Sequence, residues 1–92
     1  MSTVRIPPVL RAQAGGAKTL DLAGATVGEV LEALVTAHPG LRPQVFTAEG
    51  ELNRFVNVYV DGQDVRYTGE LATAVGERDD VVILPAMAGG GG

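Results

Sequence analysis

The residues best placed to do chemistry are the last seven of the chain. Residues 86–92 read AMAGGGG, a run of small side chains that ends at the α-carboxylate of Gly92. Because glycine has no Cβ, such a segment can pass through a narrow channel and present an unhindered carboxylate to another protein. The chemistry this predicts is activation of the carboxylate by a separate enzyme. The alternative is a frayed terminus without a role, since chain ends are commonly disordered.

The remaining candidates for chemistry have structural explanations. The chain contains no cysteine, which excludes disulfides, thiolate catalysis and cysteine-based metal sites. Its single histidine, His38, falls at the expected end of a helix, where an imidazole suits a cap or surface role. Glu77, Asp79 and Asp80 share a glycine-containing turn and are expected to be solvated rather than to bind a metal. We therefore predict that the chain is not an enzyme and itself holds no metal or cofactor.

Composition limits the class of protein and of partner. The chain has 92 residues, enough for one domain with a modest core, and 46% of them are hydrophobic. Its net charge is -4 and its seven basic residues are scattered, which argues against binding to nucleic acid. No apolar run reaches the roughly 20 residues of a membrane span. Pro7 and Pro8 interrupt the segment where a signal peptide would be apolar, so we expect a cytoplasmic protein.

The first half of the chain predicts a hairpin and a helix. Residues 4–10 and 18–22 are expected to form two strands joined by a loose glycine turn. Thr26 and Glu29 match a capping box, and apolar residues then recur at helical spacing until His38 and a proline end the helix.

The second half predicts further strands with short connections. Residues 54–60 are rich in β-branched and aromatic side chains, with Val56, Val58 and Val60 expected inward and Phe55, Asn57 and Tyr59 on a mixed outer face. The other expected elements are a helical turn at 41–46, a loop at 47–51, a turn at 61–62, a short strand around 65–66, a helical connector at 70–75 and a last strand at 81–84 that a proline stops.

The element order is thus β-β-α-β-β-β, which predicts an α+β domain whose mixed sheet packs on one principal helix. This is a ubiquitin-like order. The predicted domain spans residues 1–85, and residues 86–92 are expected to form a flexible glycine-rich tail.

Four sequence segments carry a family resemblance that covers essentially the whole chain. They read RFVNVYV at 54–60, DVR at 64–66, LATA at 71–74 and ILPAMAGG at 83–90. With the element order, they resemble the ubiquitin-like sulfur carriers of the ThiS and MoaD group, and within it the CysO branch. The resemblance implies a β-grasp fold.

The resemblance also implies a function and a set of partners. The C-terminal glycine of such a carrier is adenylated by an enzyme of the ThiF and MoeB kind and converted to a thiocarboxylate. In the CysO branch a PLP-dependent cysteine synthase accepts the sulfur, and a JAMM-type zinc peptidase releases cysteine. Related carriers serve thiazole, molybdopterin or thiosugar synthesis. The ATP, PLP and zinc would belong to the partner enzymes.

In one respect the chain departs from the family pattern, which stops at the pair matching Gly89 and Gly90. The predicted site of adenylation is the carboxylate of Gly92, with that of Gly90 after processing as the alternative. Ahead of it, Ala88, Gly89, Gly90 and Gly91 would thread the partner's channel. The rival function is that of a ubiquitin-like adaptor whose tail is merely a linker.

A docking surface is expected beside the tail. Successive residues of a strand face opposite sides, and the family register turns Val82 and Leu84 outward. Together with Tyr59 and Phe55 they would form an exposed apolar patch for the activating enzyme. The alternative is that the chain's own loop around Phe46 covers this face.

Overall fold

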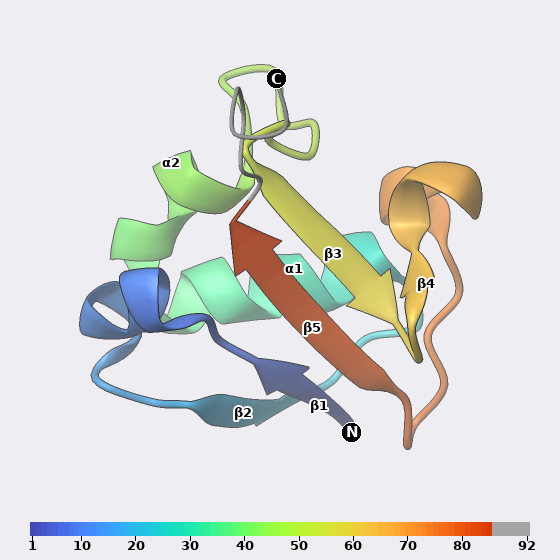
Figure 1. Ribbon diagram of the computed structural model, residues 1–92, viewed down its shortest axis with the longest axis horizontal. Coiled ribbons are helices and arrows are strands. Elements are labelled where there is room, and N and C mark those ends of the chain that lie inside the picture. The colour runs from blue at the N-terminus through green and yellow to red at the C-terminus, as the bar shows by residue number, and fades with distance from the viewer. Residues whose placement is uncertain (86–92) are drawn as a thin grey trace.

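The computed structural model describes residues 1–85. Five strands form one mixed sheet in the order β2-β1-β5-β3-β4, and the helix α1 (Val27–Ala37) packs across one face of it (Figure 1). No helix covers the opposite face of β3 and β5 in this part of the chain (Figure 1). This arrangement confirms the predicted α+β class with a mixed sheet on one principal helix.

The strand that leads to the tail lies in the middle of the sheet. β5 (Asp80–Pro85) pairs in parallel with β1 (Ser2–Arg5) and antiparallel with β3 (Val56–Val60). β2 (Thr19–Leu22) and β4 (Gln63–Asp64) are the edge strands. β5 is therefore the central strand of the sheet, and the described part of the chain ends on it.

The predicted first hairpin is confirmed in its pairing but not in its extent. β1 and β2 are antiparallel partners, yet the predicted strand at 7–10 is wrong, because Pro8–Ala14 forms a 3₁₀ helix. The paired prolines lack the N–H groups that a strand needs and have the φ of a helix start. Leu10 donates its N–H to the carbonyl of Pro7 at 3.0 Å and is buried, so the segment closes one end of the core.

The helix α1 begins where the capping pattern predicts. The hydroxyl of Thr26 accepts a hydrogen bond from the N–H of Glu29 at 3.2 Å, and the Glu29 carboxylate accepts one from the N–H of Ala25 at 2.8 Å. The helix ends at His38, whose N–H donates to the carbonyl of Leu34 at 2.9 Å. His38 therefore caps α1 through its backbone.

The core lies between α1 and the inner face of the sheet. Val56, Val58 and Val60 all point inward, as their alternation predicts, with exposures of 8% or less. Around them, α1 and the strands β1 and β5 contribute these buried residues: Val4, Val27, Val30, Leu31, Leu34, Val35, Val81 and Ile83.

The connections between elements are mostly short 3₁₀ and helical turns. The predicted turn at 41–46 is confirmed as Pro39–Leu41 followed by α2 (Arg42–Val45), and the predicted connector at 70–75 contains the turn Glu70–Ala72. Within residues 1–85, no helix has the length and apolar character needed to cross a membrane.

The short strand predicted around 65–66 is present, but it lies two residues earlier as β4 (Gln63–Asp64). The strand β4 ends at Asp64, and Val65–Tyr67 forms a 3₁₀ turn instead. The reason is local, because the Asp64 carboxylate accepts a hydrogen bond from the N–H of Arg66 at 2.9 Å and so starts the turn.

Candidate functional site

The tail that carries the predicted chemistry starts at the end of β5. There Pro85 pairs with Val56, the first residue of β3. All the positions assigned to adenylation and threading lie outside the described residues: Ala88, Gly89, Gly90, Gly91 and Gly92. The predicted flexible tail, residues 86–92, lies outside them as well.

The four predicted docking residues gather on the helix-free side of the sheet next to Pro85. We call them the apolar sheet patch: Phe55, Tyr59, Val82 and Leu84. Tyr59 and Val82 are direct cross-strand partners on β3 and β5, and Leu84 lies two residues further along β5. Phe55 is 60% exposed and Leu84 43%, whereas Tyr59 and Val82 are half-buried. The patch is thus an apolar surface beside the start of the tail.

The loop around Phe46 does not cover this surface. Phe46 is only 5% exposed and belongs to the core cluster. The segment that follows turns back through a bridge between Phe46 and Leu52. Among residues 1–85, the segment around Phe46 therefore leaves Phe55 and Leu84 exposed, against the alternative in which this loop covers the patch.

A side-chain clamp holds the approach to β3 and with it the position of Phe55. The amide oxygen of Asn53 accepts a hydrogen bond from the N–H of Phe55 at 2.9 Å, and its amide nitrogen donates to the carbonyl of Pro43 at 3.2 Å. One side chain thus links α2 to the residue that begins the patch.

Two ion pairs flank the patch on either side. Arg5 on β1 contacts Asp80 on β5 at 3.0 Å, and Arg66 contacts Asp64 at 3.0 Å beside β4. The hydrogen bond from the Arg66 side chain holds the pKa of Asp64 below its ordinary value. Each pair combines one positive and one negative group, so this rim is balanced in charge although the whole chain carries a net charge of -4.

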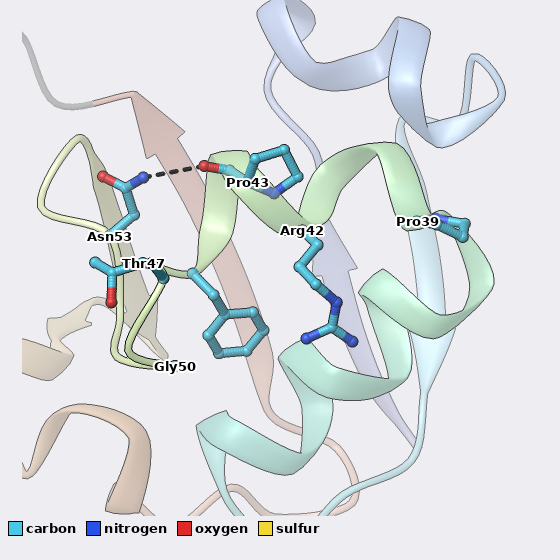
Figure 2. A pocket seen from close by; sticks show the side chains of 8 residues that line it. Pro39, Arg42, Pro43, Thr47, Gly50 and Asn53 are labelled. Atoms are coloured by element: carbon cyan, nitrogen blue, oxygen red, sulfur yellow. Dashed lines mark hydrogen bonds between the residues drawn. The ribbon is translucent and has the colours of Figure 1, made fainter.

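A separate hollow lies on the helical side of the sheet. It has a volume of about 700 Å³ and is lined by residues of the turn Pro39–Leu41, of α2 and of the following loop, among them Pro39, Pro43 and Thr47. Figure 2 shows Arg42 reaching into this space from α2. Its guanidinium pairs with Glu32 of α1 at 3.0 Å and lies 5.8 Å from the centre of the Phe46 ring. The hollow therefore lies beside the Arg42–Glu32 pair, and Asn53, which holds Phe55, also lines it.

The acidic turn before β5 is used for structure. The Asp79 carboxylate accepts a hydrogen bond from the N–H of Gly76 at 2.7 Å, which lowers the pKa of Asp79, and Asp80 pairs with Arg5. Within residues 1–85, no group of three or more His, Cys, Asp or Glu side chains could hold a metal ion.

One exposed aromatic residue was not anticipated by the sequence. Tyr67 is 85% exposed in the 3₁₀ turn after β4, next to Arg66. No element or role was predicted for Tyr67 from the sequence.

Comparison with known proteins places this geometry in a family. A sequence model of the ThiS family matches residues 4–90. The sulfur carrier protein CysO of Mycobacterium tuberculosis is 44% identical over 90 residues, which are 96% of this chain and 97% of that protein. Small archaeal modifier protein 1 of Haloferax volcanii is 43% identical over 82 residues, which are 86% of this chain and 90% of that protein.

A solved structure agrees with these sequence relatives. A chain of the Amycolatopsis orientalis BexX/CysO complex is 42% identical and matches with a TM-score of 0.89, covering 98% of this chain and 100% of that chain. This likeness confirms the predicted ubiquitin-like β-grasp fold. The chain thus belongs to the ThiS family and is a sulfur carrier protein of the type that includes CysO and small archaeal modifier protein 1, rather than an enzyme.

Proposed function

We propose that the chain carries sulfur as a thiocarboxylate on its C-terminal glycine and donates it for the synthesis of cysteine. The observation that supports this most directly is the position of the apolar sheet patch beside Pro85, where a partner can bind the domain and receive the tail at once. The similarity to CysO of Mycobacterium tuberculosis supports the choice of cysteine among the possible sulfur products.

The proposed chemistry has two steps. In the first, an oxygen of the glycine carboxylate attacks the α-phosphorus of ATP, and pyrophosphate leaves. In the second, a sulfur nucleophile attacks the acyl-adenylate and displaces AMP, which leaves a carbon–sulfur bond at the chain end. The domain contributes binding and orientation, whereas an adenylating enzyme of the ThiF and MoeB kind holds the ATP.

The acceptor of the sulfur is proposed to be a PLP-dependent cysteine synthase, followed by a JAMM-type zinc peptidase that releases the product. A thiosugar or thiazole synthase is the alternative acceptor. CysO of Amycolatopsis orientalis has been crystallised with BexX, which supports a mode of action in which such a carrier docks onto another protein.

Intact-mass spectrometry tests the proposal. The chain is incubated with the adenylating enzyme, ATP and a sulfide source, and a reaction without ATP is the control. We expect a mass increase equal to the exchange of one oxygen for sulfur, located by fragmentation at the last glycine. An unchanged mass with an enzyme that is active on another carrier would overturn the proposal.

A second candidate function is protein modification. It is favoured by the similarity to small archaeal modifier protein 1 of Haloferax volcanii. The same activated carboxylate would then be attacked by an amine of another protein, with an amide bond formed and AMP released. Conjugates of higher mass in the same reactions, formed only when acceptor proteins are present, would identify this use.

A further inference from the structure

Asn57 places an amide in the middle of the apolar sheet patch. It lies between Phe55 and Tyr59 in the sequence and is the cross-strand partner of Leu84 on β5. Its immediate neighbours in β3 are core valines, so strand alternation turns Asn57 to the same outer face as the patch. The patch is therefore apolar around its margin and polar at its centre.

The amide oxygen has no partner in the part of the chain that the structure describes. Oδ1 of Asn57 is buried and accepts no hydrogen bond there, although the residue as a whole is partly exposed. A buried acceptor without a hydrogen bond is unfavourable compared with an apolar side chain of the same shape. A leucine at position 57 would thus suit the isolated fold better than the asparagine does.

A partner that covers the patch changes the balance at this amide. The torsion about its Cβ–Cγ bond is broad and nearly two-fold, so either end of the carboxamide can turn outward. A covering surface removes water from that end and must replace it with a hydrogen-bonding group. A wholly apolar surface would leave the amide unsatisfied and bind poorly.

We infer that Asn57 is a specificity residue, which selects a partner that presents a hydrogen-bonding group opposite the centre of the patch. The inference rests on the proposed function. Its partner is the adenylating enzyme, because the patch adjoins Pro85 and a protein that receives the tail must cover the surface where the tail begins. Apolar contacts would supply most of the surface buried in the complex, and the amide would favour a partner surface that offers it a hydrogen bond.

Steady-state kinetics of thiocarboxylation, with the carrier as the varied substrate, test this role. Asn57→Leu should raise KM about 10- to 100-fold, because the partner's group loses its hydrogen bond in a buried contact, and kcat should change less than about twofold. The Tm of the variant should be equal to that of the wild type or higher. The matched control is Thr19→Leu on the outward face of β2, which should leave KM unchanged.

Asn57→Asp has nearly the same shape and keeps only acceptors. A KM close to that of the wild type would support the inference with the partner as donor. A rise as large as that of Asn57→Leu would support it with the amide as donor.

Three results would overturn the inference. An unchanged KM for Asn57→Leu would show that the amide does not select the partner. This holds even if the variant self-associates, because Asn57 would then serve solubility instead. A clearly lower Tm would show that the amide bonds within its own chain. If the wild-type chain acquires no sulfur, the proposed function is refuted. If the wild type and Asn57→Leu react equally well, only the inference about Asn57 is refuted.

Discussion

At the scale of single residues, Leu84 is the exposed apolar residue of β5, and it directly precedes Pro85, where the described chain ends. Replacement by glutamate puts a charge into a surface that a partner must dehydrate, so Leu84→Glu should raise the carrier's KM for adenylation at least about tenfold. Because Leu84 is 43% exposed, the Tm should change little. Kinetics and thermal unfolding on the same sample measure both effects.

Val9 provides the matched control for this substitution. It is an exposed valine at 65%, and it lies in the 3₁₀ helix Pro8–Ala14 rather than on the sheet. Val9→Glu adds the same charge and should leave KM within about twofold of the wild type. Equal losses at both positions would show a general effect of charge, and unfolding of Leu84→Glu would show that Leu84 supports the core.

The ion pair between Asp64 and Arg66 predicts a dependence of stability on pH. The folded state holds the pKa of Asp64 below the ordinary value of 3.8, so its stabilisation is complete above that value and is lost as the pH falls through the folded pKa. Asp64→Asn should lower the free energy of unfolding by on the order of 0.5–1 kcal/mol at pH 7, since the pair is partly exposed. The difference between the two chains should shrink as the pH falls below 3.8 and through the lowered pKa of Asp64 in the folded state.

Urea unfolding between pH 2 and pH 7 measures this difference, and Glu49→Gln is the control. Glu49 is an exposed loop residue, and the substitution removes the same charge. A constant gap between Asp64→Asn and the wild type across this range would contradict the assignment of the effect to the ionised carboxylate.

Single residues were predictable from the sequence where one rule decided their position. Alternation in 54–60 was sufficient to orient the valines and Tyr59, because a strand has a period of two and one of its faces is buried. The missing hydrogen bond of Asn57 could not be predicted, since it depends on which groups neighbouring strands bring near the amide. The exposure of Tyr67 depends in the same way on a turn that Asp64 starts.

At the scale of elements, packing of α1 against the inner face of the sheet stabilises the fold. Leu31 is completely buried in the core cluster, so Leu31→Ala should leave a cavity and lower the free energy of unfolding by about 2–5 kcal/mol. That is a large share of the roughly 5–15 kcal/mol available to a small domain. Denaturant unfolding measures the loss, and the exposed Thr36→Ala on the same helix should stay within about 0.5 kcal/mol. A similar loss at both positions would contradict a role in packing.

The elements that the sequence predicted correctly have strong periodic signals. The helix from Val27 has both a capping box and a five-position apolar stripe, and β3 alternates buried valines with Asn57 and Tyr59. The segment 7–14 lacks such a period, and the decision between strand and 3₁₀ helix depends on burial of Leu10 and Ala14 against the rest of the core. Short elements of this kind are fixed by tertiary contacts more than by local sequence.

At the scale of the whole molecule, the topology explains why the tail has a firm base. The parallel pairing of β1 with β5 joins the two ends of the domain, and β3 closes the other side of β5. Element order alone did not predict which strand is central. The described domain thus ends at Pro85 of the central strand, and under the proposed function the seven residues that follow would have to reach another protein's active site.

The last prediction concerns the length of that reach. The ThiS family match ends at Gly90, and two more extended residues lengthen the tail by up to about 7 Å. A chemical step that needs atoms placed within a few tenths of an ångström is sensitive to such a shift. We therefore expect that a chain shortened to end at Gly90 acquires sulfur at least as fast as the full chain, whereas one extended by a residue after Gly92 stays unreactive until a peptidase removes the addition.

Time courses of intact mass for the three chains measure these rates, with thermal unfolding as the control that the domain is unchanged. A faster chain ending at Gly90 would identify Gly91 and Gly92 as residues removed or tolerated before the reaction. Reaction of the full chain alone would instead assign the working carboxylate to Gly92 and give the partner a longer channel. Sulfur acquired by the extended chain, without prior cleavage, would contradict adenylation at the terminal glycine altogether.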